Sequence, residues 1–362
     1  MAIDRRTFLK LGLTTLSLGP ARLLAGIGHT RLLSCRTDLQ GHHFVTMLDE
    51  NGRIIMDIPL PARGHGIAVD SSNKLAAVFA RRPGDFVWII DLTNHKVTNR
   101  VTAEEGQHFY GHGLFTTDGR HLLCSENAYE TGEGRIGIYD PAMGYKRTGE
   151  LSSQGIGPHE IKLLSDSRTL VVANGGIRTH PDLPRIKSNL QTMEPNLAYI
   201  DLQNGQLLQK YEPPSKWHQL SIRHIDVAAD DTVAIAMQFQ GRPQNQPPLI
   251  GIHKHGESMK LLMAPDEVQR RMRNYCGSVT FNSEGSHFAV SSPRGGLVTF
   301  WSRRGEYLGL HQQQDACGIG RTSDSLIISD GSGRLVLTDQ PGARHEIGTT
   351  QDSRWDNHLT SL

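Results

Sequence analysis

The chain has 362 residues, with 38 Lys and Arg against 37 Asp and Glu, so its formal charge is +1. Such an even balance, without long runs of like charge, gives no electrostatic basis for nucleic-acid binding or for a charged tail. The 38 glycines suit many short strands joined by tight turns. Histidine, with 18 residues, is the one unusual feature of the composition.

The first 26 residues are predicted to be an export signal and not part of the fold. Residues 4–10, Asp-Arg-Arg-Thr-Phe-Leu-Lys, resemble the twin-arginine export motif. The weakly apolar run at residues 11–18 is too short to span a bilayer. Twin-arginine export carries proteins that are already folded, often with a cofactor inserted. We therefore expect a periplasmic protein without a stable membrane span, folded as one domain over residues 30–362.

A short apolar strand opened by Gly-His or Cys-Gly recurs seven times, and most copies run on to an acidic turn. The marker residues are separated by intervals of 41 to 65 residues; they are His65, His112, His159, His224, Cys276, Cys317 and His358. Intervals of this size are typical of propeller or solenoid arrays. We therefore predict an all-β, seven-bladed β-propeller of the YVTN/WD40-like kind. Two β-sandwiches are the alternative, but they would not explain seven near-equal units.

Both ends of the chain are predicted to complete one blade. Residues 31–35, 43–48 and 53–58 are expected to be strands, with a hairpin turn at residues 49–52. These three strands lack an innermost partner, which a strand at residues 358–362 would supply. A ring closed in this way leaves no open sheet edge.

The repeated His and Cys residues are the candidate metal ligands. Each stands at the head of an innermost strand, so we expect all of them to face the mouth of the central channel. Imidazole and thiolate ligands favour copper, zinc or iron, and copper or iron is our predicted cofactor. Seven positions on one ring cannot all reach one ion, so the preferred set is the half-ring of His65, His112, His159 and His358. The structural alternative is that each residue caps its strand and bonds the neighbouring blade.

Loops on the same face are predicted to surround this mouth. They include the insertion at residues 175–196 and the loops at residues 80–86, 125–135 and 238–248. The predicted ligand-binding residues of this region are His180, Asp182, Arg185, Arg223 and Glu126. Residues 265–273 could form a short helix. Cys276 and Cys317 could form a disulfide if their strands lie close enough.

Motifs for covalent catalysis are missing from the sequence. There is no Gly-x-Ser-x-Gly phrase and no glycine-rich phosphate loop followed by a helix. A lactonase-type propeller would need carboxylates beside a metal, for which Glu104, Glu105, Glu126 and Glu160 are available. We assign no catalytic residue, and the sequence favours a protein that is not an enzyme.

The insertion also carries a family resemblance. Residues 174–182, Asn-Gly-Gly-Ile-Arg-Thr-His-Pro-Asp, together with the Gly-His-Gly phrases and the twin-arginine start, resemble an uncharacterised bacterial family of exported seven-bladed propellers. Members of that family are commonly found beside imelysin-like periplasmic proteins implicated in iron uptake. The resemblance covers essentially the whole chain. It implies a propeller and a link to iron or other metal handling, but it supplies no reaction.

Three functional hypotheses follow. The first is a periplasmic propeller that binds a metal ion or metal-containing ligand at the channel mouth, as an accessory protein in metal acquisition with partners of the imelysin type. The second is a propeller enzyme, either a lactonase-like hydrolase or an oxidoreductase. The third is a non-catalytic platform for protein binding, in which the histidines bond only to backbone.

Overall fold

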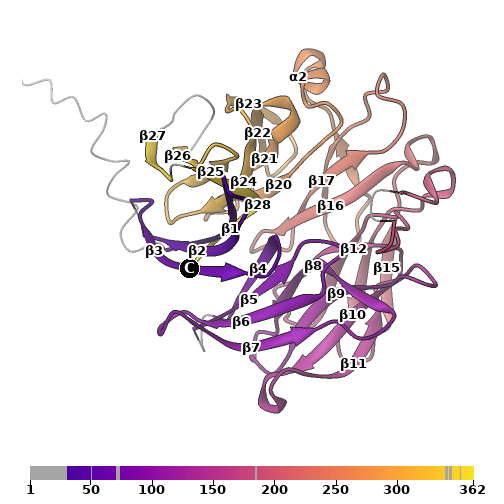
Figure 1. Ribbon diagram of the computed structural model, residues 1–362. Helices are drawn as coiled ribbons and strands as arrows, with labels where there is room; N and C mark the ends of the chain where they lie inside the picture. Colours follow the sequence, from indigo (N-terminus) through magenta and orange to yellow (C-terminus); the bar gives the residue numbers. More distant parts are fainter. Residues whose placement is uncertain are drawn as a thin grey trace, which may run out of the picture.

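A computed structural model describes residues 31–49, 51–70, 74–183, 186–338, 341, 345–350 and 352–362. The predicted signal at residues 1–26 and the loop residue Arg185 lie outside this range. The described chain forms seven four-stranded antiparallel sheets arranged around a central axis (Figure 1). The predicted all-β, seven-bladed propeller is therefore confirmed.

Blades 1 to 6 follow the chain order, and within each of them the chain runs from the innermost strand outward. Blade 1 contains β4 (Gly64–Asp70), β5 (Leu75–Ala80), β6 (Phe86–Asp91) and β7 (Lys96–Thr102). Blade 2 contains β8 (Gln107–Phe115), β9 (Leu122–Ala128), β10 (Glu133–Asp140) and β11 (Lys146–Ser152). Blade 3 contains β12 (Pro158–Leu163), β13 (Thr169–Asn174), β14 (Asn196–Asp201) and β15 (Leu207–Tyr211).

The second half of the ring has the same plan. Blade 4 contains β16 (Leu220–Val227), β17 (Val233–Phe239), β18 (Ile250–His253) and β19 (Lys260–Leu262). Blade 5 contains β20 (Ser278–Phe281), β21 (His287–Ser292), β22 (Leu297–Ser302) and β23 (Tyr307–Gln312). Blade 6 contains β24 (Ala316–Arg321), β25 (Leu326–Asp330), β26 (Arg334–Thr338) and β27 (His345–Thr349).

Blade 7 joins the two ends of the described chain, as predicted. Its innermost strand is β28 (Ser353–Ser361), followed by β1 (Leu32–Asp38), β2 (His43–Leu48) and β3 (Ile54–Leu60). The antiparallel register pairs Leu32 with Ser361 and Asp38 with Ser353. Figure 1 shows the indigo N-terminal strands beside the yellow C-terminal ones. This pairing satisfies the backbone groups that an open sheet edge would expose.

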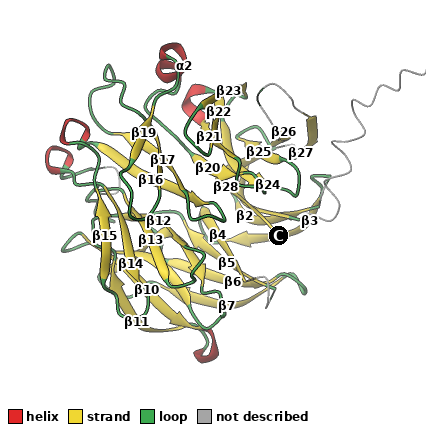
Figure 2. Ribbon diagram, turned by 180° about the vertical axis from the view of Figure 1, so that it is seen from behind, coloured by secondary structure: helices red, strands yellow, loops and turns green. Residues whose placement is uncertain are grey.

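Helical segments are short and lie in the connections between strands (Figure 2). They are η1 (Pro141–Met143), η2 (Leu190–Thr192), η3 (Ser215–Trp217), α2 (Asp266–Arg271) and η4 (Pro293–Gly295). The helix α2 confirms the short helix predicted at residues 265–273. Within the described residues, no helix has both the length and the apolar character needed to cross a membrane.

The core lies between neighbouring blades. Phe79 and Ile89 of blade 1, for example, pack with Phe109, Leu122 and Tyr139 of blade 2 in one buried cluster. Alternate residues of the middle strands point to opposite faces of each sheet, so each sheet contributes apolar side chains to two such clusters. This packing fixes the inner strands around the channel and thereby positions the histidines that they carry.

Candidate metal centre

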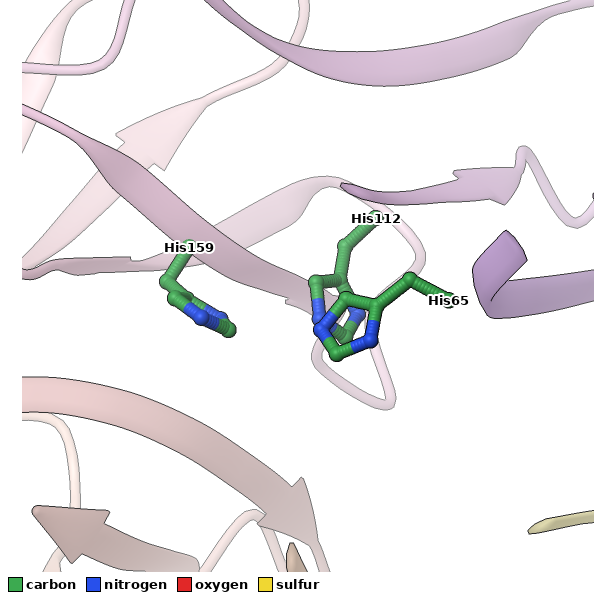
Figure 3. Close-up of side chains that lie close together, drawn as sticks. All are labelled: His65, His112 and His159. Carbon is green, nitrogen blue, oxygen red and sulfur yellow. The ribbon is translucent and has the colours of Figure 1, made fainter. Parts of the chain in front are cut away.

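Five histidines from five consecutive inner strands meet in the central channel. We call them the histidine cluster: His358 of β28, His65 of β4, His112 of β8, His159 of β12 and His224 of β16. Their ring centroids lie 4.5 Å apart for His65 and His358, 5.0 Å for His112 and His159, and 4.6 Å for His159 and His224. Figure 3 shows the rings of His65, His112 and His159 gathered in one place.

A register shift accompanies each histidine of the cluster. The pairing of an inner strand with its neighbour slips at residues 64–67 in β4, 109–113 in β8, 158–160 in β12 and 222–224 in β16, and it also slips where β28 pairs with β1. A β-bulge bends the strand and re-aims a side chain. Only His65 and His159 stand near the starts of their strands as predicted. His112, His224 and His358 lie further along β8, β16 and β28. The bulges help to turn all five side chains toward the axis.

Glycines beside the histidines allow the inner strands to approach closely. A Cβ on Gly66 would lie 2.6 Å from the carbonyl oxygen of Gly111 and 2.9 Å from Nδ1 of His112. Gly111 adopts φ +99°, and a Cβ there would lie 2.8 Å from Cδ2 of His65. The Gly-His-Gly phrase therefore has a physical reason, because larger residues would push the rings and strands apart.

One imidazole of the cluster is oriented by a buried carboxylate. Nδ1 of His65 lies 2.6 Å from Oδ1 of Asp356, and Nε of Arg63 lies 2.6 Å from Oδ2. Burial alone would raise the pKa of Asp356, but His65, Arg63 and Arg81 together hold that pKa well below its ordinary value. Because Nδ1–H of a neutral His65 donates a hydrogen bond to the Asp356 carboxylate, the Nε2 lone pair is left to face the cluster.

A second carboxylate, that of Glu160, orients the imidazole of His224. Nδ1 of His224 lies 3.3 Å from Oε2 of Glu160, whose other oxygen lies 3.3 Å from Nζ of Lys162. Burial opposes ionisation of Glu160, but the charge of Lys162 and the hydrogen bond with His224 outweigh it and lower the pKa of Glu160. Carboxylate-bound imidazoles of this kind are typical of metal-ligating histidines.

Each of the remaining three imidazoles has a buried nitrogen atom that finds no hydrogen-bond partner among the described residues. These atoms are Nε2 of His112, Nδ1 of His159 and Nε2 of His358. Burial lowers the pKa of all three rings well below the ordinary value, and it lowers the pKa of His65 to about 3. Neutral rings offer lone pairs, and buried nitrogens without a partner call for a water or an ion to satisfy them.

The geometry fits a metal ion held by three imidazoles. Two groups, His65–His112–His159 and His112–His224–His358, each place one ligand atom per residue within 4.8 Å of the others. Zinc-type bonds of about 2.0–2.1 Å in a tetrahedron separate the nitrogens by about 3.3 Å, so binding would draw the rings inward by about an ångström. His112 belongs to both groups and is therefore the central residue of the cluster. Three of the four preferred ligands, His65, His112 and His159, are thus brought together in one group.

A cavity of about 350 Å³ adjoins the cluster on the side toward which the inner strands run. His112 and His358 line its inner end, and charged side chains line its walls. There Lys162 lies 3.9 Å from Asp226, and Arg321 lies 3.7 Å from the same carboxylate. The charges in this half of the channel are therefore balanced by ion pairs.

The two predicted cysteine ligands lie outside both histidine groups. Cys276 is fully buried in an apolar cluster, with Sγ 3.8 Å from the carbonyl oxygen of Leu249, and burial raises its pKa to about 12. Sγ of Cys317 lies 3.1 Å from the carbonyl oxygen of Asp315. Both thiols are free, as are Cys35 and Cys124, so the suggested disulfide is not formed. Burial raises the pKa of both thiols.

The predicted loop residues have different locations. Arg223 is buried at the channel, next to His224. His180 packs against Tyr129, and Asp182 is exposed at the insertion. Glu126 was predicted to face the channel mouth, but it turns away from it. Tyr139 and Arg147, in the outer half of blade 2, donate hydrogen bonds of 2.6 and 2.8 Å to its carboxylate.

Sequence reasoning missed Asp356 as an orienting residue. It lies two positions before His358 on β28 and reaches His65 of the next blade. The phrase Asp-Asn-His at residues 356–358 is the available signal. Sequence reasoning also missed Tyr110. This residue directly precedes the Gly-His phrase of β8 and packs beside His159, with ring centroids 6.2 Å apart.

These features define a seven-bladed propeller with buried histidine triads that could hold a metal ion. Residues 58–362 match the family described as "Protein of unknown function (DUF1513)", and the chain belongs to that family. Among solved structures, Kuenenia stuttgartiensis Hydrazine Synthase is similar, with a TM-score of 0.62 and 13% identity over 85% of this chain and 95% of that chain. At this identity the likeness shows the fold alone. No curated protein matches the chain.

Proposed function

We propose that this protein is a periplasmic propeller that binds a transition-metal ion in its histidine cluster and serves in metal acquisition. The observation that carries the proposal is the set of buried nitrogens on His112, His159 and His358 that have no hydrogen-bond partner in the described part of the chain. Carboxylates that orient His65 and His224 support it, because metal-binding imidazoles commonly have such partners.

The donor set narrows the class of ion. Neutral imidazoles suit copper, zinc, iron and nickel, whereas calcium and magnesium prefer oxygen ligands. Without thiolates in either triad, a soft sulfur site is disfavoured. The resemblance to exported propellers found beside imelysin-like proteins favours iron, and the imidazole set is equally suited to copper. The ion would be enclosed by five inner strands, so we expect slow exchange.

Metal binding is tested most directly by replacing the histidine that both triads share. Wild-type protein and the variants His112→Gln and His108→Gln would be dialysed separately against Cu²⁺, Zn²⁺ and Fe²⁺, with the bound ion measured by elemental analysis. His108 is the matched control, because it is a buried histidine of the same strand that bonds Phe109 and Asn127 and not the cluster. We expect near-stoichiometric metal in wild type and control, and at least a hundredfold weaker binding in His112→Gln.

Two results would contradict the proposal: wild-type protein without tightly bound metal, or a folded His112→Gln variant that binds as wild type does. His358→Gln serves as a second variant if His112→Gln does not fold. Circular dichroism and thermal unfolding of each protein separate loss of a ligand from loss of structure.

Export is the second part of the proposal, and it rests on the twin-arginine motif at residues 4–10. We expect Arg5→Lys together with Arg6→Lys to hold the protein in the cytoplasm, while the unchanged protein is recovered from the periplasm. Immunoblots of cell fractions measure this. Equal periplasmic amounts of both proteins would contradict export by this route. Partners of the imelysin type are proposed from the family resemblance, and co-purification from the periplasm tests them.

A propeller enzyme is the second candidate, favoured by the cavity of about 350 Å³ beside the cluster. Glu160 and Asp226 on its wall provide carboxylates near a bound ion. Metal-dependent turnover of a lactone or of a redox substrate, lost in Glu160→Gln, would support this candidate. The third hypothesis, a platform with structural histidines, expected rings bonded only to backbone. In the described part of the chain, the ring hydrogen bonds of His65 and His224 go to carboxylates instead.

A further inference from the structure

The two sides of the histidine cluster differ in how open they are. We call the side toward which the inner strands run the strand-end side, and the opposite one the strand-start side. On the strand-end side the cavity of about 350 Å³ reaches the cluster, and His112 and His358 line it. His358 is partly exposed, whereas His65, His112 and His224 are buried. Of the two triads, His112–His224–His358 has two members on the cavity wall and the other has one.

A tyrosine closes the strand-start side of the cluster. Tyr110 is 2% exposed, and its ring centroid lies 6.2 Å from that of His159. Its hydroxyl accepts a hydrogen bond of 2.9 Å from Nη1 of Arg82 and donates a long one of 3.5 Å to the carbonyl oxygen of Ile177 in the insertion. The space around this hydroxyl is small, since a Cβ on Gly157 would lie 2.7 Å from it. Close packing and hydrogen bonds thus hold Tyr110 against the cluster.

A second cavity, of about 470 Å³, lies on the strand-start side and apart from the cluster. Arg63, Arg294 and Asn357 are among the residues that line it. Its described lining residues include no histidine of the cluster. Of these two cavities, only the strand-end one is therefore in contact with the imidazoles.

Two cations line the strand-end cavity. Lys162 comes from blade 3 and Arg321 from blade 6, and their side chains are 37% and 44% exposed. Both approach Oδ1 of Asp226 in blade 4, at 3.9 and 3.7 Å, while Oδ2 accepts a hydrogen bond from a backbone amide. Lys162 also lies 3.3 Å from Glu160. The contact of Arg321 with Asp226 is longer than a hydrogen bond, so it restrains the guanidinium only weakly. A metal ion on its way to His358 would pass both cations.

We propose that the metal ion enters and leaves the cluster through the strand-end cavity, and that His112–His224–His358 is the first triad that it meets. This inference rests on the proposed metal binding and adds the route that the ion takes. Positive charges along a route slow an approaching cation and are screened by salt, so Lys162 and Arg321 lower the rate of uptake. Because Tyr110 closes the other side, one obstruction in the strand-end cavity should slow entry and exit alike.

Two threonines of blade 7 provide a matched pair for the test. Thr360 of β28 lines the strand-end cavity, Thr37 of β1 lines the cavity on the strand-start side, and both are partly exposed. Each hydroxyl makes one hydrogen bond, Thr360 with the carbonyl oxygen of Ile67 at 3.2 Å and Thr37 with Nδ1 of His43 at 2.9 Å. Tryptophan is common in strands, and its side chain would fill part of either cavity.

Metal-free wild type, Thr360→Trp and Thr37→Trp are mixed with Cu²⁺ in a stopped-flow spectrometer, and release of the ion to excess EDTA is followed separately. We expect Thr360→Trp to slow uptake and release by at least about tenfold each, because the ion must wait for the indole to move aside. Since both rates change alike, its dissociation constant should stay within about twofold of the wild-type value. Thr37→Trp should match wild type in all three quantities.

The outcomes separate the route from metal binding itself. Equal rates in the two variants, or slowing by Thr37→Trp alone, would overturn the route and leave metal binding intact. Wild type that takes up no metal would overturn the proposed function and this inference together.

Arg321→Gln serves if circular dichroism shows that Thr360→Trp does not fold. At low ionic strength we expect it to take up Cu²⁺ at least about threefold faster than wild type, and the gain should shrink in high salt. Arg294→Gln is its control, because Arg294 is exposed on the strand-start side, where it lies over the ring of Tyr275. Equal uptake rates in Arg321→Gln and Arg294→Gln would contradict the route.

Discussion

Gly66→Ala is expected to reduce the free energy of unfolding by about 1–3 kcal/mol and to displace the ring of His112. The added Cβ would lie 2.6 Å from a backbone oxygen, that of Gly111, on the neighbouring inner strand. A flexible side chain could move aside, but a backbone carbonyl at the centre of a closed ring of strands cannot do so without shifting the strand. Since Gly66 does not have a positive φ, the effect is steric and not one of backbone conformation.

Gly149→Ala is the matched control for this prediction. Gly149 lies on the outermost strand β11, and a Cβ there would meet only Cδ1 of Ile138 at 3.9 Å, an ordinary contact. We expect its free energy of unfolding to equal or slightly exceed that of wild type. Urea unfolding of the three proteins measures the difference, and metal titration of Gly66→Ala reports on the cluster. Equal stability of both variants would contradict this prediction, because it would mean that β4 and β8 can accommodate the added methyl group.

The fold could be predicted because its signals are local and repeated. The Gly-His phrase recurs at intervals that match one blade, and each copy supplies an inner strand. The three strands near residue 31 needed an innermost strand, and the single strand near residue 358 needed a sheet. Their pairing in blade 7 could therefore be predicted. The bounds were less accurate: β28 begins at Ser353, five residues before the predicted start, because the bulge at the histidine was not visible in the sequence.

The candidate site could be predicted only in part. The seven marker positions look equivalent in the sequence, but five bring their rings together, whereas Cys276 and Cys317 lie outside both histidine groups. A bulge alone does not decide which of these side chains joins the cluster. In blade 5, β20 pairs with β21 without a register shift, but in blade 6 the register of β24 shifts between Ala316 and Ile319, across Cys317, which still lies outside both groups.

Residues that act across blades were the hardest to predict. Asp356 and His65 are 291 positions apart, and they meet because β28 and β4 are neighbours in the closed ring. Arg223 was assigned to the mouth, and only the structure shows that it is buried next to His224. Sequence spacing locates such residues on a face, and the contacts that decide their protonation come from other strands.

Acid is expected to destabilise the metal-free protein steeply between pH 6.5 and pH 5. The cluster histidines His65, His112, His159 and His358 have pKa values lowered by burial, to about 3 for His65. In the unfolded chain their pKa is about 6.5, so below that pH the unfolded state binds protons that the folded state does not. The free energy of unfolding is therefore unchanged above about pH 7 and falls as pH decreases.

The size of the effect follows from the same linkage. A histidine that stays neutral in the folded protein costs about 2 kcal/mol of stability at pH 5, and four of them approach the whole stability of a typical domain. Urea unfolding in chelator-treated buffer from pH 8 to pH 5 measures the slope. His112→Gln should give a shallower slope because one proton-binding group is lost.

His95→Asn is the control for the acid prediction and should leave the slope unchanged. His95 is exposed and has φ +53°, a conformation that asparagine tolerates. A flat profile from pH 7 to pH 5 in wild type would mean that the cluster takes up protons while folded. That outcome would remove the neutral lone pairs on which the metal site depends, so the acid profile also tests the chemistry of the cluster.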